Sequence, residues 1–120
     1  MSSEKPRILI VDDQKDVADA VCRLLLGAGF EVETAYSPED ALSRVDRFKP
    51  AVVISDYDLG PMTGERLLLE IIHRRPTTRG LIVSGRPSAA ASASFPFVAK
   101  PFVAATLMAA VRAVLQVAND

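Results

Sequence analysis

The chain has a single cysteine, no tryptophan and almost no net charge. Cys22 has no second thiol to pair with, which excludes an internal disulfide and suits a reducing compartment. A net charge of −1 leaves no general basic surface of the kind that binds nucleic acid. No apolar run is long enough to cross a bilayer, and the polar first residues do not form a secretory signal. These absences predict a cytoplasmic protein that binds neither nucleic acid nor membrane.

The apolar content is high for a chain of this size. Hydrophobic residues make up 49% of the 120 positions, so the chain has enough apolar surface to build a real core. The length suits one domain and is too short for two. We therefore expect a single domain over residues 1–120, with an ordered core of about residues 7–118.

The stretch 51–56, AVVISD, is the centre of the predicted fold. It is uncharged and mostly β-branched until it ends in Asp56, and Pro50 and Gly60 bound it. Such a run predicts a strand buried on both faces, as in a parallel sheet covered by helices. The same reading predicts further strands at 7–11, 31–35, 81–83 and 97–99 and helices at 15–28, 38–48, 64–75 and 103–118. Strands that alternate with helices predict a three-layer α/β sandwich with a parallel sheet.

The predicted strands end in polar residues suited to chemistry. Asp12 and Asp13 follow the first strand, and Asp56 ends the central one. In open parallel sheets, ligands bind at the carboxyl ends of the strands. Three neighbouring carboxylates repel one another, and a hard divalent cation such as Mg²⁺ relieves that repulsion. The backbone carbonyl of Asp58 is a plausible third protein ligand for that cation.

Two further strand ends would complete a site for a phosphoryl group. Ser84 follows the fourth strand and Lys100 follows the fifth. Asp56 can then act as a nucleophile that forms an acyl phosphate, with Mg²⁺ and Lys100 neutralising charge. No histidine or second base is placed to drive fast hydrolysis. We therefore expect a signalling module that catalyses only its own phosphorylation and slow dephosphorylation.

Four motifs together resemble the receiver domain of bacterial two-component response regulators over nearly the whole length. They are ILIVDD at 8–13, the segment 55–64 that begins with Ser-Asp, VSG at 83–85 and KPF at 100–102. The resemblance implies the flavodoxin-like sheet order 2-1-3-4-5. It also implies a sensor histidine kinase or phosphotransfer protein as the phosphoryl donor. We expect a monomer or weak homodimer.

The resemblance also implies a role for each candidate site residue. Asp13, Asp56 and the carbonyl of Asp58 would bind Mg²⁺, and Asp12 would act partly through a water molecule. The three other candidates lie on or directly after the fourth and fifth predicted strands. Ser84 and Lys100 would contact the phosphoryl group, Phe97 would occupy the aromatic switch position, and the bond from Lys100 to Pro101 would be cis.

The sequence departs from the family pattern most clearly between Ser84 and Lys100. This interval is shorter than usual by well over one helical turn, and Pro87 and Pro96 bracket mostly alanine and serine. A helix of about two turns is marginal, so we expect the fourth helix to be shortened or missing. In this respect the chain resembles receivers attached to hybrid kinases.

Smaller departures are a proline one place late in the loop after Asp56, at Pro61, and a switch ring without a hydroxyl.

Two alternative functions remain open at this point. The first is a degenerate receiver that acts only as a protein-interaction module. The second is a small Mg²⁺-dependent phosphohydrolase, because Asp56 and Asp58 match the DxD pattern of haloacid-dehalogenase-type phosphatases. Against the second, the acids here lie upstream, at Asp12 and Asp13, whereas that family carries its acidic cluster downstream.

Overall fold

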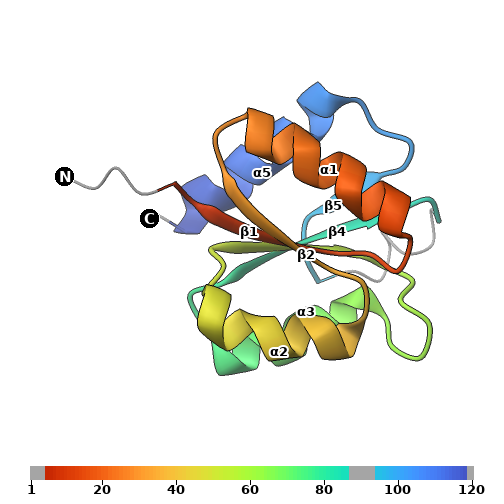
Figure 1. Ribbon diagram of the computed structural model, residues 1–120, viewed down its shortest axis with the longest axis vertical. Helices are drawn as coiled ribbons and strands as arrows, with labels where there is room; N and C mark the ends of the chain where they lie inside the picture. The colour runs from red at the N-terminus through yellow and green to blue at the C-terminus, as the bar shows by residue number, and fades with distance from the viewer. Residues whose placement is uncertain (1–4, 87–93, 119–120) are drawn as a thin grey trace.

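The computed structural model describes residues 5–86 and 94–118. Strands and helices follow one another along the chain as the sequence predicts (Figure 1). The elements are β1 (Arg7–Val11), α1 (Lys15–Gly27), β2 (Glu31–Ala35), α2 (Pro38–Phe48), β3 (Val52–Asp56), α3 (Gly64–Arg74), β4 (Arg79–Ser84), β5 (Phe97–Ala99) and α5 (Ala104–Ala118).

The strands form one parallel sheet of five, in the order β2-β1-β3-β4-β5. Helices α1 and α5 cover one face, and α2 and α3 cover the other (Figure 1). This arrangement confirms the predicted flavodoxin-like sandwich and its strand order. Since β1 and β3 are direct neighbours, the residues that follow them come together at one edge of the sheet.

The core consists of two apolar clusters, one on each face of the sheet. Alternate residues of each central strand point to opposite faces, so Ile8 and Ile10 join one cluster and Leu9 and Val11 the other. All five residues of β3 are buried, as expected for a strand covered on both sides.

Local sequence signals set the start of two helices. The Ser37 side chain accepts a hydrogen bond from the backbone N–H of Asp40 (3.1 Å), and Pro38 occupies the first turn of α2, as the sequence predicts. Thr63 caps α3 in the same way, accepting from Arg66 N–H at 3.2 Å. Both caps satisfy backbone donors that a helix start leaves without a partner.

The structure corrects the extent of some elements. The fourth strand begins at Arg79, two residues before the predicted start, because Arg79 and Gly80 pair with Val52 and Val53 of β3. Sheet partners have extended a strand whose own apolar run is short. The last helix begins one residue late, at Ala104. The prediction that the fourth helix is shortened or missing concerns residues outside the described ranges, since 87–93 are not described.

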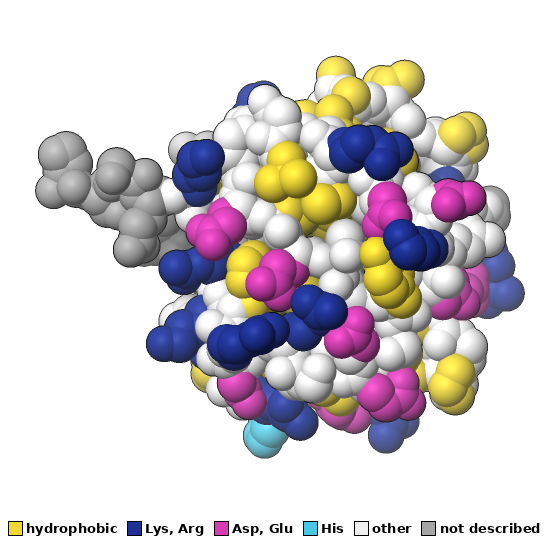
Figure 2. Space-filling model, viewed as in Figure 1, with side chains coloured by type: hydrophobic (Ala, Val, Ile, Leu, Met, Phe, Trp, Pro, Cys, Tyr) yellow, Lys and Arg dark blue, Asp and Glu magenta, His cyan; other side chains and the backbone are white. Residues whose placement is uncertain are grey.

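The surface carries charges of both signs. In the view of Figure 2, lysine and arginine side chains are interspersed with aspartate and glutamate. Within the described residues, no helix is both long enough and apolar enough to cross a membrane.

Candidate functional site

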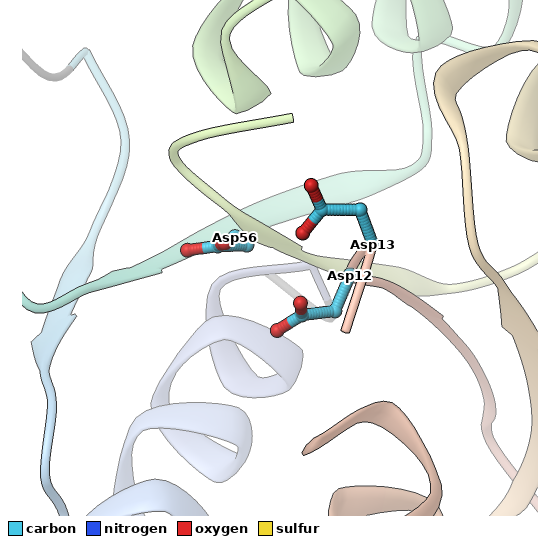
Figure 3. A group of neighbouring side chains, drawn as sticks. All are labelled: Asp12, Asp13 and Asp56. Carbon is cyan, nitrogen blue, oxygen red and sulfur yellow. The ribbon is translucent and has the colours of Figure 1, made fainter. Parts of the chain in front are cut away.

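Three carboxylates meet at the carboxyl ends of β1 and β3 (Figure 3). The two strands pair in register, with Val11 opposite Ser55, so the residues after them lie side by side. One carboxylate oxygen from each of Asp12, Asp13 and Asp56 lies within 4.8 Å of the other two. The predicted convergence of these three aspartates is therefore what the structure shows.

Asp12 is held by two backbone hydrogen bonds and is almost fully buried. Its Oδ1 accepts from the N–H of Gln14 (2.9 Å), and its own N–H donates to the carbonyl of Ala35 (3.1 Å). These bonds fix the turn between β1 and α1. Asp13, the next residue, is exposed, and one of its carboxylate oxygens faces the cluster.

Lys100 brings a positive charge to the acidic cluster from the opposite end of the chain. Its Nζ lies 3.4 Å from Asp12 Oδ2 and 3.4 Å from Asp56 Oδ1. The backbone N–H of Lys100 donates to the carbonyl of Ser84 (2.9 Å), and the following peptide bond to Pro101 is cis, as the resemblance implied. The ammonium group thus bridges two carboxylates that would otherwise repel.

The fold disfavours ionisation of the Asp56 carboxyl group. Burial raises the pKa of Asp56 above its ordinary value, and the nearby charge of Lys100 opposes that rise. The charges of Asp12 and Asp58 raise the same pKa further. A further positive charge near Asp56 would therefore favour the ionised form of its carboxyl group.

The backbone around Asp56 is fixed by two neighbours that the sequence analysis did not single out. The hydroxyl of Ser55 donates to the carbonyl of Asp56 at 2.9 Å. Gly64 packs directly on the same carbonyl: a Cβ there would overlap the Asp56 oxygen and lie 2.7 Å from Ser55 Oγ. Only glycine fits at that position. The close approach depends on tertiary packing, so no sequence pattern alone indicated it.

The remaining predicted residues lie around this cluster. Ser84 is buried at the end of β4, where its Oγ accepts from the N–H of Arg86 (3.0 Å). The Asp58 side chain is exposed and pairs with Arg86, with Asp58 Oδ2 3.5 Å from Nε. Phe97 is partly buried on β5 and packs on the cluster that α2 and α3 cover.

The donor set fits a hard divalent cation. Carboxylate oxygens are the ligands that Mg²⁺ prefers, and one or two of them suffice because the ion keeps several waters. Asp12, Asp13 and Asp56 supply three such groups, whereas the carboxylate of Asp58 is not part of that group. The cluster also lacks the thiolate and imidazole ligands typical of zinc and copper sites.

Comparison with known proteins identifies one family. The family model described as the response regulator receiver domain matches residues 8–112. The transcriptional regulatory protein PrrA of Mycobacterium leprae is 29% identical over 117 residues, which cover 92% of this chain and 50% of that protein. A protein-glutamate methylesterase/protein-glutamine glutaminase of Anaeromyxobacter dehalogenans is 37% identical over 71 residues, 59% of this chain and 20% of that protein.

The curated relatives are longer proteins: this chain spans half or less of the length of each of these two. Two solved receiver domains match over nearly the full length of both chains. A CheY-like receiver domain protein of Methanospirillum hungatei is 26% identical with a TM-score of 0.86, over 97% of this chain and 98% of that one. A receiver domain of an HD domain-containing protein from Pseudomonas fluorescens is 25% identical with a TM-score of 0.87, over the same shares.

Proposed function

This chain belongs to the response regulator receiver domain family, and on that premise we propose that it takes a phosphoryl group onto Asp56 as a signal. The donor is the phosphohistidine of a sensor histidine kinase or phosphotransfer protein. The observation that carries the proposal is the meeting of Asp12, Asp13, Asp56 and Lys100 at one edge of the sheet.

The covalent step takes place between the Asp56 carboxylate and the phosphohistidine of the donor. A carboxylate oxygen of Asp56 attacks phosphorus, so that an O–P bond forms as the P–N bond of the phosphohistidine breaks. The released imidazole nitrogen keeps the bonding electron pair and can take a proton from solvent. Such reactions depend mainly on positioning and charge neutralisation. Lys100, 3.4 Å from Asp56 Oδ1, neutralises charge on one side.

Mg²⁺ suits the acidic side of the site. Asp13 and Asp56 would hold the ion together with the backbone carbonyl of Asp58, and Asp12 would act partly through a water molecule. When bound, the ion supplies positive charge to the oxygens of the incoming phosphoryl group. The raised pKa of Asp56 supports this assignment, because a cation beside the carboxylate favours its ionised form.

Ser84, Lys100 and Phe97 would couple the phosphoryl group to a change of shape. Ser84 is buried at the end of β4, and its hydroxyl donates to a phosphoryl oxygen while Lys100 pairs with the same group. Lys100 follows Phe97 by three residues, and the ring packs on the core. A protein partner then reads the altered surface. The single cysteine supports a cytoplasmic setting for this exchange.

Intact mass spectrometry tests the acceptor. After incubation with acetyl phosphate and Mg²⁺, we expect one phosphoryl adduct on the wild type and none on Asp56→Asn. Asp46→Asn is the matched control, because Asp46 is an exposed aspartate of α2, and it should be phosphorylated like the wild type. Failure of the wild type to gain any adduct would instead favour a domain that only binds proteins.

A second measurement tests the switch. Lys100→Ala should still gain the adduct, because Asp56 remains in place. It should lose most of the phosphorylation-dependent chemical-shift changes outside the site, measured by NMR of labelled protein. Equal changes in both proteins would count against the role given to Lys100.

A further inference from the structure

Arg86 joins the two loops that flank Asp56. It lies two residues beyond the end of β4, and its Nε is 3.5 Å from Asp58 Oδ2 in the loop after β3. The guanidinium carbon is 6.0 Å from the centroid of the Tyr57 ring. Its side chain therefore reaches the two residues that directly follow Asp56.

The backbone of Arg86 also acts on the site through Ser84. Its N–H donates to Ser84 Oγ at 3.0 Å. A hydroxyl that accepts one hydrogen bond keeps its own proton as a donor. Ser84 is thus oriented by Arg86, and the two residues present a hydroxyl donor and a guanidinium from one turn of the chain.

The contacts of the guanidinium are easily exchanged. The side chains of Arg86 and Asp58 are 61% and 51% exposed, and 3.5 Å is long for a charge-assisted hydrogen bond. Exposed pairs of this kind contribute little to stability. A stronger anion close to Asp58 would therefore compete successfully for Arg86.

Phosphorylation of Asp56 would create that anion. A phosphoryl group carries more negative charge than a carboxylate and offers three oxygens, which a guanidinium can bind in a forked arrangement. Asp58 lies only two residues from Asp56. Since the guanidinium already contacts Asp58 and Tyr57, we expect rotation of the Arg86 side chain to bring it to a phosphoryl group on Asp56.

We propose that, once Asp56 is phosphorylated, the Arg86 side chain moves away from Asp58 and Tyr57 and binds the phosphoryl group. This inference rests on the proposed function. In the unphosphorylated protein Asp58 keeps Arg86 beside the site, and after phosphorylation Arg86 and Lys100 contact the group from the chain segments that follow β4 and β5. The Asp58 carboxylate then loses its ion pair with Arg86 and is hydrated by solvent.

Beryllium fluoride, which binds a carboxylate as a phosphoryl mimic, provides the test. Titration with Mg²⁺ present, followed by ¹⁹F NMR, gives its affinity for the wild type and each variant. Arg86→Gln should weaken binding about tenfold, the loss expected for one charge-assisted hydrogen bond, and Arg86→Lys should recover part of it. Asp58→Asn should tighten binding about threefold, because it frees Arg86 and removes a competing charge.

Arg112→Gln, an exposed arginine of α5, is the matched control and should bind like the wild type. A spectroscopic signature separates direct contact from a general effect of charge: the Nε–Hε signal of Arg86 should shift when beryllium fluoride binds. Thermal melts of each variant confirm folding.

Two results would overturn the inference and leave the proposed function intact. One is a wild-type affinity in Arg86→Gln, and the other is an Arg86 signal that stays in place while the mimic binds. If the wild type neither binds beryllium fluoride nor gains a phosphoryl adduct at Asp56, both proposals fail together.

Discussion

The strands β3 and β5 each hold a residue of the site in place at their carboxyl ends, but they are built very differently. Strand β3 has five buried residues and a hydrogen-bonded neighbour on each side. Strand β5 has three residues, one of them buried, and among the described strands it pairs with β4 alone. The proposed nucleophile, Asp56, ends the first, and the proposed coupling residue, Lys100, follows the second.

This difference separates the chemistry from the response. An acceptor carboxylate must be held in one geometry, and the buried strand β3 provides a rigid base for Asp56. A residue that transmits a change must be able to move, and an edge strand with one neighbour has fewer contacts to break. We therefore expect substitutions around β3 to cost stability and substitutions around β5 to cost less.

The largest effect should come from the packing of α3 against the end of β3. Gly64→Ala would force a methyl group into the Asp56 carbonyl and should destabilise the protein by roughly 3 kcal/mol or more. Gly27→Ala is the control, since a Cβ there meets nothing within 4 Å, and it should be neutral or stabilise by up to about 1 kcal/mol. Urea denaturation measures the free energy of unfolding of both variants. Equal values would contradict the predicted overlap at Gly64.

A pair of matched truncations compares the strands directly. Val53→Ala in β3 and Val98→Ala in β5 remove the same atoms from buried positions, 0% and 4% exposed. We expect about 2–3 kcal/mol of destabilisation at Val53 and about 1 kcal/mol at Val98. The edge strand β5 can shift more easily than β3 to fill the cavity that the substitution leaves. A larger loss at Val98 would show that the edge is as tightly packed as the centre.

A smaller effect is expected from the charge at the end of β3. The folded-state pKa of Asp56 is raised, so the folded protein binds a proton there more tightly than the unfolded chain does. Without metal, stability should therefore fall as the pH rises from the ordinary aspartate range through the raised pKa. Asp56→Asn should remove this dependence and raise the melting temperature at pH 7 by roughly 2–5 °C.

Circular dichroism melts in a chelating buffer, repeated across that pH range, measure the pH dependence of stability and the change in melting temperature of Asp56→Asn. A variant that melts below the wild type at pH 7 would mean that the pair with Lys100 outweighs the cost of burial.

The smallest expected effect is on Mg²⁺ affinity. Protons and Mg²⁺ compete for the Asp56 carboxylate. The affinity for Mg²⁺ should therefore decrease as the pH falls through the raised pKa of Asp56, by up to about tenfold for each further pH unit below it. Calorimetric titration at several pH values tests this, with Asp13→Asn as a comparison that should bind weakly throughout. An affinity that is constant down to the ordinary aspartate range would contradict the raised pKa.

Much of the fold and site could be predicted because strong local patterns coincide with the final structure. The apolar runs of β1 and β3 lead into their aspartates, and Ser37 caps α2, which begins at Pro38. The length of β4 was underestimated, because Arg79 and Gly80 join the strand through their pairing with β3. The roles of Gly64 and Arg86 were missed as well, since Gly64 packs on the end of β3 and Arg86 pairs with Asp58 in the loop after it.

The sequence by itself determined which residues would stand at the ends of the strands, because hydrophobic runs and their polar ends are local properties of the chain. Only the tertiary structure decided how these ends meet. The neighbouring positions of β1 and β3 bring Asp12 and Asp13 to Asp56, and folding brings Lys100 within 3.4 Å of two carboxylates. Distances, burial and the resulting shift in the pKa of Asp56 depend on contacts between segments distant in sequence, and no local pattern encodes them.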